Sequence, residues 1–335
     1  MFIRALASIS PQPTFGASSL PAPVEHFSNR LSCIEPDYRE FIDPKMIRRM
    51  SRIIRMGVAA ASACLRNADI VAPDAIVTGT AYGCLEDTGV FLNRMIEFNE
   101  EMLNPTSFIQ STHNTVGAQI ALSVKCYGYN NTFVHRGFSF ESALLDGALL
   151  LRDKEVKNVL VGAADEITNI SFDILNRFGI YREDGLSNLS LTDNPGRGTI
   201  AGEGASFFLL TDEASPHNAA TLDGTHTFYK PSGPEETIAE IRSFLQAQSL
   251  TMDGVDLVIN GKNGDLINDK TYDAITDVIF KQTPQASYKH LCGEYPTSSA
   301  FALWYAAMKL NPAKTILIYN HYKNIHHSLI LISAC

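Results

Sequence analysis

The sequence has no long hydrophobic run, and none of its windows approaches eighteen uninterrupted apolar residues. A helix that crosses a bilayer needs about 20 consecutive, mostly apolar residues, so we expect no membrane-spanning segment. The opening stretch MFIRALASIS also lacks a basic region followed by a long apolar one. We therefore predict no signal peptide and a cytoplasmic location.

Paired cysteines are also missing. No CxxC motif and no Cys/His cluster with zinc spacing is present, since the six cysteines are Cys33, Cys64, Cys84, Cys126, Cys292 and Cys335. Dispersed thiols are typical of a reducing compartment. The chain has no Walker loop and no GxGxxG motif at a strand end. We predict neither a metal site nor a nucleotide or flavin cofactor.

The chain lacks a dense basic run, and its formal net charge is −9 at pH 7. Because affinity for nucleic acid depends largely on neutralising phosphates with Lys and Arg, we do not expect a nucleic-acid binder. The most basic stretch, KMIRRMSRIIR (Lys45 to Arg55), has apolar residues at helical spacing. It predicts an amphipathic helix whose basic face is either solvated or a docking patch for an acidic partner.

What is present is enough apolar material for a large core: 45% of the 335 residues are hydrophobic and 19% are charged. Strand-like and helix-like segments alternate along the chain, which indicates an α/β fold whose sheets are covered by helices. We predict strands at 74–83, 131–134, 156–166 and 202–212, and helices at 88–103, at 115–128 and from residue 139 to 151.

The second part of the chain repeats the pattern of the first. Residues 254–265 resemble 73–84, because each is an aliphatic strand that runs into Gly and polar residues. Residues 293–320 resemble 137–163 in their order of Gly, polar turn, small-residue helix and aliphatic strand. A repeat of this size predicts two pseudo-symmetric halves, which we place at 1–213 and 224–335.

One segment has the shape that enzymes use to present a nucleophile. In NNTFVHRGFSFES an extended stretch leads through a tight turn at Gly137 into an apolar helix. The residue at the tip, Phe138, has no reactive atom. The next residue, Ser139, could attack only with a base beside it. The alternative interpretation is that Ser139 caps the helix, with its hydroxyl accepting from the backbone N–H of Glu141 or Ser142.

Several stretches, in a common order, resemble the β-ketoacyl synthases of the thiolase-like fold. They are RRMSRIIRMGVAAASACLRNADI, IVTGTAYG, NPTSFIQSTHNTVGAQIAL, NVLVGAADE, GRGTIAGEGASFFLL and YKHLCGEYPTSSAFAL. The resemblance implies a layered αβαβα thiolase-like fold made of two halves. It also implies descent from enzymes that condense carrier-bound thioesters with a catalytic Cys and two His residues.

The resemblance fails at the positions that carry this chemistry. Counting back from VGAADE places Phe138 where the family has its Cys. Lys262 stands at the His of the family's Asn-x-His-Gly-Thr pattern, and Glu294 stands where the second His follows the Lys-x-x-x-Gly motif. Lys289 and Gly293 keep the Lys-x-x-x-Gly motif, but the glycine-rich gate falls on NHYKNIHHS, residues 320–328, which has no glycine. Standard condensation is therefore expected to be lost. We predict that Phe138 plugs the former site, and that Lys262 and Glu294 form an ion pair across it.

Family members without the nucleophile act as chain length factors beside an active ketosynthase. The resemblance therefore implies a non-condensing subunit, of the kind found in bacterial aryl polyene-type polyketide clusters, in a heterodimer or homodimer that also meets an acyl carrier protein. The segment YNNTFVH (residues 129–135) would form the dimer edge. The residues implied to line an acyl tunnel are Phe108, Ile109, Phe140 and Lys289.

Two alternatives remain open from the sequence. The first is an acyltransferase with altered chemistry that uses Ser139 or Cys292 as its nucleophile. The second is a homodimeric scaffold that binds acyl carrier proteins through the basic stretch Lys45 to Arg55. The sequence leaves open whether the protein is an enzyme.

Overall fold

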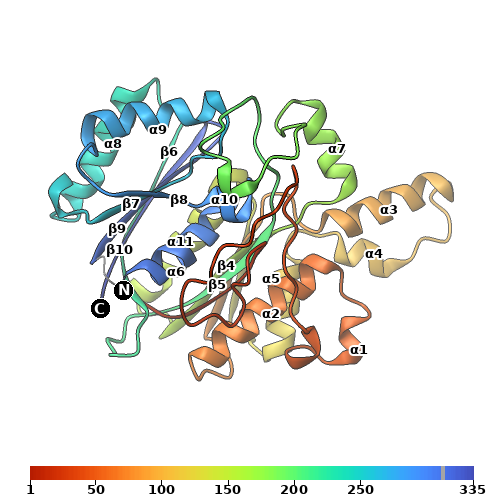
Figure 1. The fold of residues 1–335 in the computed structure, drawn as a ribbon. Coiled ribbons are helices and arrows are strands. Elements are labelled where there is room, and N and C mark those ends of the chain that lie inside the picture. The colour runs from red at the N-terminus through yellow and green to blue at the C-terminus, as the bar shows by residue number, and fades with distance from the viewer. Residues whose placement is uncertain (311–313) are drawn as a thin grey trace.

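The computed structural model describes residues 1–310 and 314–335, and in them ten strands join into one sheet (Figure 1). The strands are β1 (Phe2–Ile9), β2 (Ala75–Gly79), β3 (Tyr129–Phe133), β4 (Asn158–Asp165), β5 (Gly204–Thr211), β6 (Ala220–Tyr229), β7 (Leu257–Asn260), β8 (Gln285–Ser287), β9 (Thr315–Tyr322) and β10 (His326–Ser333). The helices are α1 (Pro44–Ile47), α2 (Arg52–Asn67), α3 (Leu85–Glu97), α4 (Pro105–Gln110), α5 (Thr115–Val124), α6 (Ser139–Arg152), α7 (Asn169–Arg177), α8 (Pro234–Ala247), α9 (Leu266–Ile279), α10 (Lys289–Cys292) and α11 (Ser299–Lys309).

The sheet consists of two five-stranded halves with the same internal order. Across the sheet the strands run β3-β2-β4-β5-β1-β6-β10-β9-β7-β8. Read from its outer edge, the first half has the order β3-β2-β4-β5-β1, and the second half has the corresponding order β8-β7-β9-β10-β6. The two halves join where β1 pairs with β6. In each half the outer pairings are parallel and the inner ones antiparallel. The repeat predicted from the sequence is therefore present in the topology.

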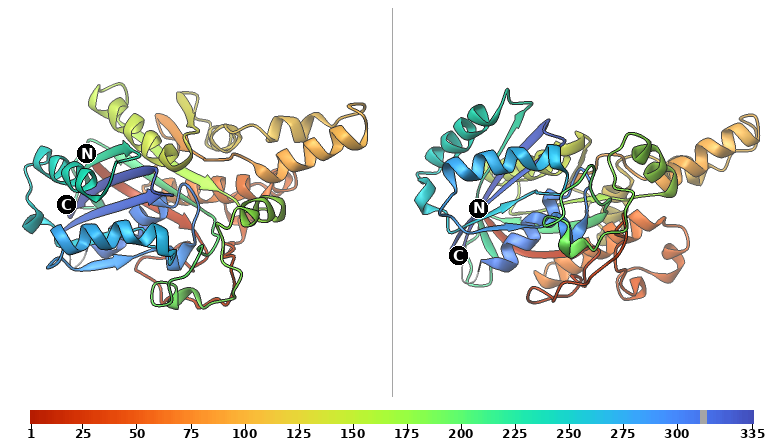
Figure 2. Two further views of the ribbon diagram at one scale, coloured as in Figure 1. Left: turned by 90° about the horizontal axis from the view of Figure 1, so that it is seen from above. Right: turned by 45° about the horizontal axis from the view of Figure 1, so that its top comes forward.

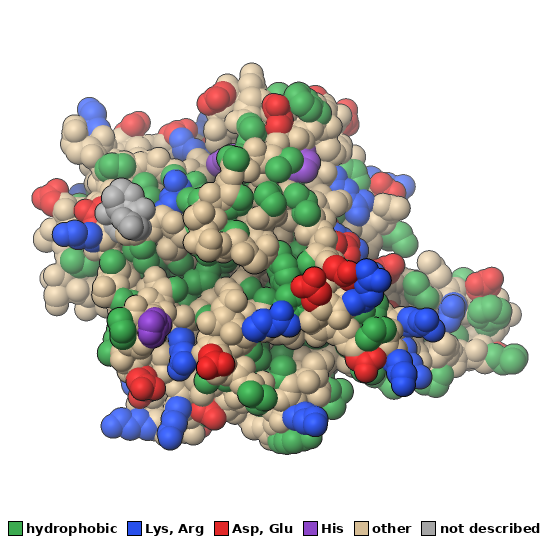
Figure 3. Space-filling model, turned by 60° about the horizontal axis from the view of Figure 1, so that its bottom comes forward, with side chains coloured by type: hydrophobic (Ala, Val, Ile, Leu, Met, Phe, Trp, Pro, Cys, Tyr) green, Lys and Arg blue, Asp and Glu red, His purple; other side chains and the backbone are tan. Residues whose placement is uncertain are grey.

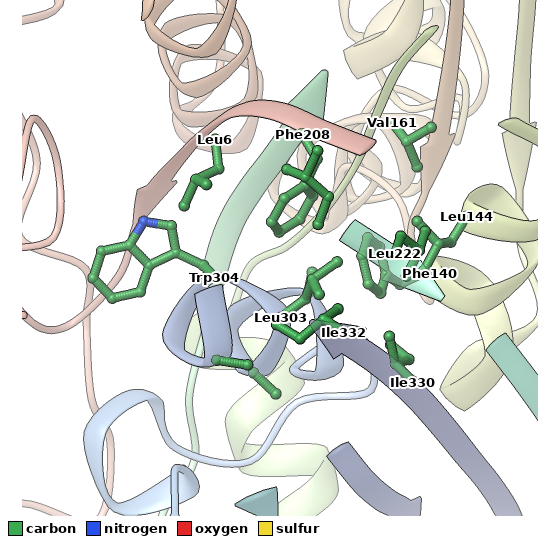
Figure 4. Packing of buried hydrophobic residues seen from close by; sticks show 14 of the residues in the cluster. Leu6, Phe140, Leu144, Val161, Phe208, Leu222, Leu303, Trp304, Ile330 and Ile332 are labelled. Carbon is green, nitrogen blue, oxygen red and sulfur yellow. The ribbon is translucent and has the colours of Figure 1, made fainter. Parts of the chain in front are cut away.

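Three hydrophobic clusters show that the halves are stacked in five layers. One lies between the first half-sheet and α2 with α5, and another lies between the second half-sheet and α8 with α9. The third and largest cluster surrounds α6 and α11 and takes residues from the inner faces of both half-sheets (Figures 1 and 4). This αβαβα arrangement confirms the fold class predicted from the sequence.

The central strands are hydrophobic on both faces because helices cover both sides. In β5, Phe207 and Leu209 face the α2 cluster, whereas Phe208 and Leu210 face the central cluster. This follows from the two-residue period of a strand, and it explains why SFFLL reads as an uninterrupted apolar run. In the central layer, Phe140 of α6 packs against Phe208, with ring centroids 5.8 Å apart (Figure 4).

Two local predictions are wrong. The stretch from Lys45 to Arg55 is not one amphipathic helix, because α1 ends at Ile47 and α2 starts at Arg52. The helix predicted to close at Gly128 ends earlier, where Lys125 adopts a left-handed conformation with φ 55°. Gly128 instead lies in the turn into β3, where a Cβ would be 2.1 Å from the carbonyl oxygen of Asp74.

The two halves differ in what projects from them. In the first half, α3 and α4 extend away from the layered body as an arm, residues 85–110 (Figures 1 and 2). Strand β6 begins at Ala220, and the division of the chain into 1–213 and 224–335 stays a proposal. None of the helices in the described part of the chain is long and apolar enough to cross a membrane.

Candidate functional site

The elbow predicted from the sequence is present between β3 and α6. The chain leaves β3, forms a short 3-10 turn (Arg136–Phe138) and enters α6 at Ser139. The left-handed residue is Arg136, with φ 51°, and not Gly137. Gly137 is required for another reason, since a Cβ there would be 2.7 Å from Cβ of Tyr322 and 2.9 Å from Cβ of His326. The elbow is therefore pressed against the β9–β10 hairpin.

Phe138 closes this contact with its side chain. The half-buried ring meets the imidazole of His326 edge to face, with centroids 4.7 Å apart. Such aromatic pairs contribute about 0.5–1.5 kcal/mol beyond the area they bury. Phe138 thus packs the elbow against the hairpin. The small cavity nearby is lined by other residues, and the plug role of Phe138 stays a prediction.

Ser139 neither caps the helix nor has a base, which corrects the capping prediction. Its Oγ accepts from the backbone N–H of His135 at 2.8 Å and donates to the carbonyl of Arg136 at 2.9 Å. The hydroxyl is fully buried, and the cap of α6 has no side-chain hydrogen bond. The imidazole of His135 contacts Ser142 instead. Both hydrogen bonds of Ser139 stabilise the turn, so the hydroxyl proton is not available to a base.

Cys292 has the wrong environment for a nucleophile. It is the last residue of α10, not the first residue of a helix, and it is fully buried. Its thiol contacts the carbonyl of Gly293 at 3.3 Å, and burial raises the pKa of the thiol well above its usual value. A reactive cysteine needs a stabilised thiolate and access for its substrate. In the part of the chain described, the other cysteines are buried too, except Cys335.

A buried ion pair occupies the position expected for the second histidine. The ammonium of Lys289 donates to both carboxylate oxygens of Glu294, at 2.7 and 2.9 Å, and to the carbonyl of His321 at 3.3 Å. The two side chains are only 1% and 7% exposed. Glu294 also accepts from Nδ2 of Asn263 at 2.6 Å. The charges are therefore compensated and hydrogen-bonded, which a buried pair requires.

Lys262 does not take part, and the predicted Lys262–Glu294 pair is wrong. The ammonium of Lys262 pairs with Asp273 on α9, where the two side chains are 25% and 58% exposed. The loop after β7 is held by Asp269, which accepts from the backbone N–H of Asn263 and of Gly264, both at 2.9 Å. This geometry turns Lys262 outward and the neighbouring Asn263 toward Glu294.

Glu294 is held in place by close contact between two glycine backbones. A Cβ on Gly202 would lie 2.0 Å from the carbonyl oxygen of Cys292, and a Cβ on Gly293 would lie 2.5 Å from Cα of Gly202. The backbone of Glu294 donates to Ile200 and accepts from Gly202. The glycine-rich segment before β5 therefore brings the two halves together at the site, as the close approach of two backbones demands.

Tyrosines line what remains of the cavity. Its volume is about 20 Å³, and its walls include Tyr82, Asp165, Tyr181, Glu294, Tyr295 and Tyr322. Ligand pockets usually measure about 300–1,000 Å³, so this space can hold a water molecule and not an acyl chain. The hydroxyls of Tyr82 and Tyr322 are 3.3 Å apart. Tyr82, Tyr295 and Tyr322 lie in stretches that resemble the family, but nothing in those stretches indicates that the three side chains border one cavity.

Two acidic residues at the end of β4 border the same cavity. Asp165 accepts from Thr80, from the backbone of Ala81 and from Thr297 of the second half, at 2.7–2.9 Å. Burial raises the pKa of Asp165, and these hydrogen bonds oppose the rise. Burial also raises the pKa of Glu166 to about 7. Asp165 therefore links the two halves, and Glu166 is the carboxyl here that titrates near neutral pH.

The segment expected to be the gate is a rigid hairpin. Residues 323–325 connect β9 to β10, and both Lys323 and Asn324 adopt left-handed conformations without being glycine. His321 and His327 are buried on either side of the turn, and burial lowers the pKa of both imidazoles. The hairpin lacks the freedom that glycines give, as the sequence predicts.

The four residues expected to line a tunnel fall into two groups. Phe108 and Ile109 of α4 are 55% and 62% exposed, so a partner or an acyl chain can contact them. Phe140 and Lys289 are fully buried, one in the central core and one in the ion pair. The tunnel role stays a prediction, and Phe140 and Lys289 would act only through the residues they support.

The solved structures most useful for comparison are ketosynthases and their partners. The ishigamide ketosynthase/chain length factor aligns with a TM-score of 0.82 at 18% identity, covering 100% of this chain and 98% of that one. A ketosynthase in complex with its chain length factor from Xenorhabdus doucetiae aligns with a TM-score of 0.75 at 15% identity, with coverage of 100% and 98%. At these identities the likeness shows the fold: a thiolase-like ketosynthase fold over the whole chain.

The sequence match is narrower and more specific. Residues 28–176 match the family model described as the β-ketoacyl synthase N-terminal domain. A type II polyketide acyl-carrier protein in complex with its ketosynthase is a further structural relative, with a TM-score of 0.75, 14% identity and coverage of 100% and 99%. No curated protein gives a sequence match. The resemblance inferred from the sequence is confirmed.

The buried ion pair should respond to substitution very differently from the exposed one. Lys289→Met leaves the carboxylate of Glu294 buried without its partner, and we expect the free energy of unfolding to fall by about 3–5 kcal/mol. Lys262→Met, which breaks the exposed pair with Asp273, should cost less than about 1 kcal/mol. The double variant Lys289→Met/Glu294→Leu should recover most of the loss. Urea unfolding measures all three, and equal costs for the two single variants would contradict this assignment.

Glu166 should make stability depend on pH between about 4.5 and 7. Burial raises the pKa of Glu166 in the folded protein to about 7 from its usual 4.5, so the unfolded chain releases this proton first. Stability should therefore fall as pH rises through that window and stay lower above it. Glu166→Gln remains neutral, so it should exceed the wild type by up to about 3 kcal/mol at pH 8 and by little at pH 4.5.

The matched control for Glu166→Gln is Glu97→Gln, which changes an exposed carboxylate of α3. Because surface substitutions usually change stability by less than about 0.5 kcal/mol, its difference from the wild type should stay small at pH 4.5 and at pH 8. A Glu166→Gln difference that is also constant from pH 4.5 to 8 would show that the Glu166 carboxyl titrates normally.

Proposed function

We propose that this protein is a non-condensing partner of an active ketosynthase, with the role of a chain length factor. The main support for the proposal is that other residues stand at the positions where the family has its catalytic Cys and two His. Phe138 stands at the tip of the elbow, a buried Lys289–Glu294 pair stands where the second His is expected, and the cavity that Glu294 borders measures only about 20 Å³. The scaffold of a condensing enzyme is kept, whereas the groups that would hold and attack a thioester are not.

The open edge of the sheet supports a partner. Strand β3 is at the end of the strand order, so one side of its backbone is unpaired. An edge strand of this kind is a template for another strand. Helices flank it on both sides: Asn130 donates to the carbonyl of Gly117 in α5, and Tyr129 donates to Asp146 in α6. An incoming strand would thus be supported on both faces of the sheet.

The arm extends this edge into a larger apolar surface. Neither α3 nor α4 has a buried residue, and the large apolar side chains exposed on the arm are Val90, Leu92, Ile96, Phe98, Met102, Phe108 and Ile109. Figure 3 shows hydrophobic side chains on this projecting lobe. Exposed apolar area on this scale is unusual for a monomer and indicates an interface.

Contacts along the arm connect it to β3. The rings of Phe91 and Phe108 lie 5.3 Å apart and join α3 to α4. The hydroxyl of Thr115 donates to the carbonyl of Ile109 at 3.1 Å and joins α4 to α5, which in turn contacts β3. We infer that one partner covers β3 and the arm together, and that Phe108 and Ile109 then border the space left for an acyl chain.

A basic patch beside the arm supports contact with an acyl carrier protein. Lys45, Arg48 and Arg49 are exposed on α1 and the turn after it, in a chain whose net charge is −9. The side chain of Gln110 in α4 donates to the carbonyl of Arg49, which fixes the patch next to the proposed interface. An acidic carrier protein would be attracted to this patch.

The proposed interface predicts that the same substitution at two equally exposed aliphatic residues will have very different effects on ketosynthase binding. Ile109→Asp should weaken binding to a ketosynthase that retains its Cys-His-His site by at least about tenfold, because a carboxylate would be desolvated in an apolar contact. Val278→Asp on α9 is the matched control, since Val278 is 61% exposed against 62% for Ile109. Co-expression and analytical ultracentrifugation measure complex formation.

A second prediction concerns product length. If Phe108 borders the space for the acyl chain, Phe108→Ala in the assembled complex should lengthen the product.

Two outcomes would contradict the proposal. One is equal binding by the Ile109→Asp and Val278→Asp variants. The other is a product profile that Phe108→Ala leaves unchanged in a complex shown to be intact. A stable homodimer that forms through β3 and excludes every ketosynthase would favour the scaffold alternative instead.

A further inference from the structure

A groove on the outer side of α6 is separate from the former reaction centre. It has a volume of about 450 Å³ and lies between α6, the start of β1 and the start of β6. This volume is within the usual range for small-molecule pockets, about 300–1,000 Å³. Its walls include Phe2, Leu145, Leu149 and Leu222. Leu222 is 2% exposed and forms the floor, whereas Leu145 is 50% exposed at the rim.

The apolar part of the groove follows one stripe of α6. Leu145, Leu149 and Arg152 are spaced four and three residues apart, so they lie in a row along the helix surface. Leu144 belongs to the central core, and Leu151 belongs to both the core and the groove wall, so the helix buries one face in the protein and presents the neighbouring row to the groove. An extended aliphatic chain can lie along such a row.

The charged end of the groove is basic. Arg152 and Lys154 line it together, with Asp212 as the single acidic residue in its wall. Arg152 contacts the carboxylate of the adjacent Asp153 at 3.6 Å, where both side chains are more than half exposed. Exposed ion pairs contribute little, so the guanidinium is free to exchange this contact for a better one. The groove therefore offers an apolar channel that ends at two cations.

We propose that this groove binds a fatty carboxylate. The aliphatic chain would lie along Leu145 and Leu149 above Leu222, and the carboxylate would accept hydrogen bonds from Arg152 and Lys154. A planar guanidinium is well suited to a carboxylate because it can donate two parallel hydrogen bonds. The site takes this ligand whether or not a partner subunit is bound at β3.

Isothermal titration of the full chain with decanoate, decanol and decyltrimethylammonium tests the groove. The wild type should prefer decanoate to decanol by about tenfold, since one charge-assisted hydrogen bond accounts for a factor of that size. Arg152→Glu/Lys154→Glu should abolish the preference and favour decyltrimethylammonium. The control Arg177→Glu/Lys281→Glu reverses two exposed cations elsewhere and should bind decanoate as the wild type does.

A second variant tests the apolar part. Leu149→Gln should weaken decanoate and decanol together, with the circular dichroism spectrum and the melting temperature unchanged. Equal decanoate binding by the groove and control double variants would overturn the proposal, as would no binding by the wild type. Loss of ketosynthase binding in the groove variants, with decanoate binding intact, would assign the groove to the protein interface and overturn the proposal as well.

Discussion

The buried pair of Lys289 and Glu294 is the interaction on which the candidate site depends. Removing two charges from water is costly, and the cost is recovered only when the geometry is good and the remaining hydrogen-bonding groups are satisfied. Here Asn263 and the carbonyl of His321 complete the pair, and a close glycine contact fixes the backbone of Glu294. This part of the interior is therefore packed and charge-balanced.

The pair also lies where the two halves meet. Asp165 of the first half accepts from Thr297 of the second, and Gly202 lies against Gly293. The central helices α6 and α11 share one core between the half-sheets (Figure 4). The elbow, α6 and the glycine-rich segment are therefore all needed for the packing of the duplicated fold. What remains available for function is the outer surface: the free edge at β3, the arm and the basic patch.

The fold could be predicted from the sequence because its signals are periodic and repeated. Buried strands such as SFFLL, the glycines and the echo between residues 137–163 and 293–320 all point to one architecture. The site could be predicted only to within one residue. Successive residues of a loop point in different directions, so a count that reached Lys262 missed Asn263. Likewise Ser139 bonds to the preceding turn, and no pattern in the sequence marks Tyr82 or Tyr322 as neighbours.

Intact-protein mass spectrometry after incubation with an acyl-loaded carrier protein tests the central claim most directly. The chain should gain no acyl mass, alone or with an active ketosynthase, while the cysteine of that ketosynthase is acylated in the same sample. This follows because Ser139 and Cys292 are buried and hydrogen-bonded to backbone groups. A stoichiometric acyl adduct on this chain, lost on substitution of Ser139 or Cys292 by Ala, would contradict the account.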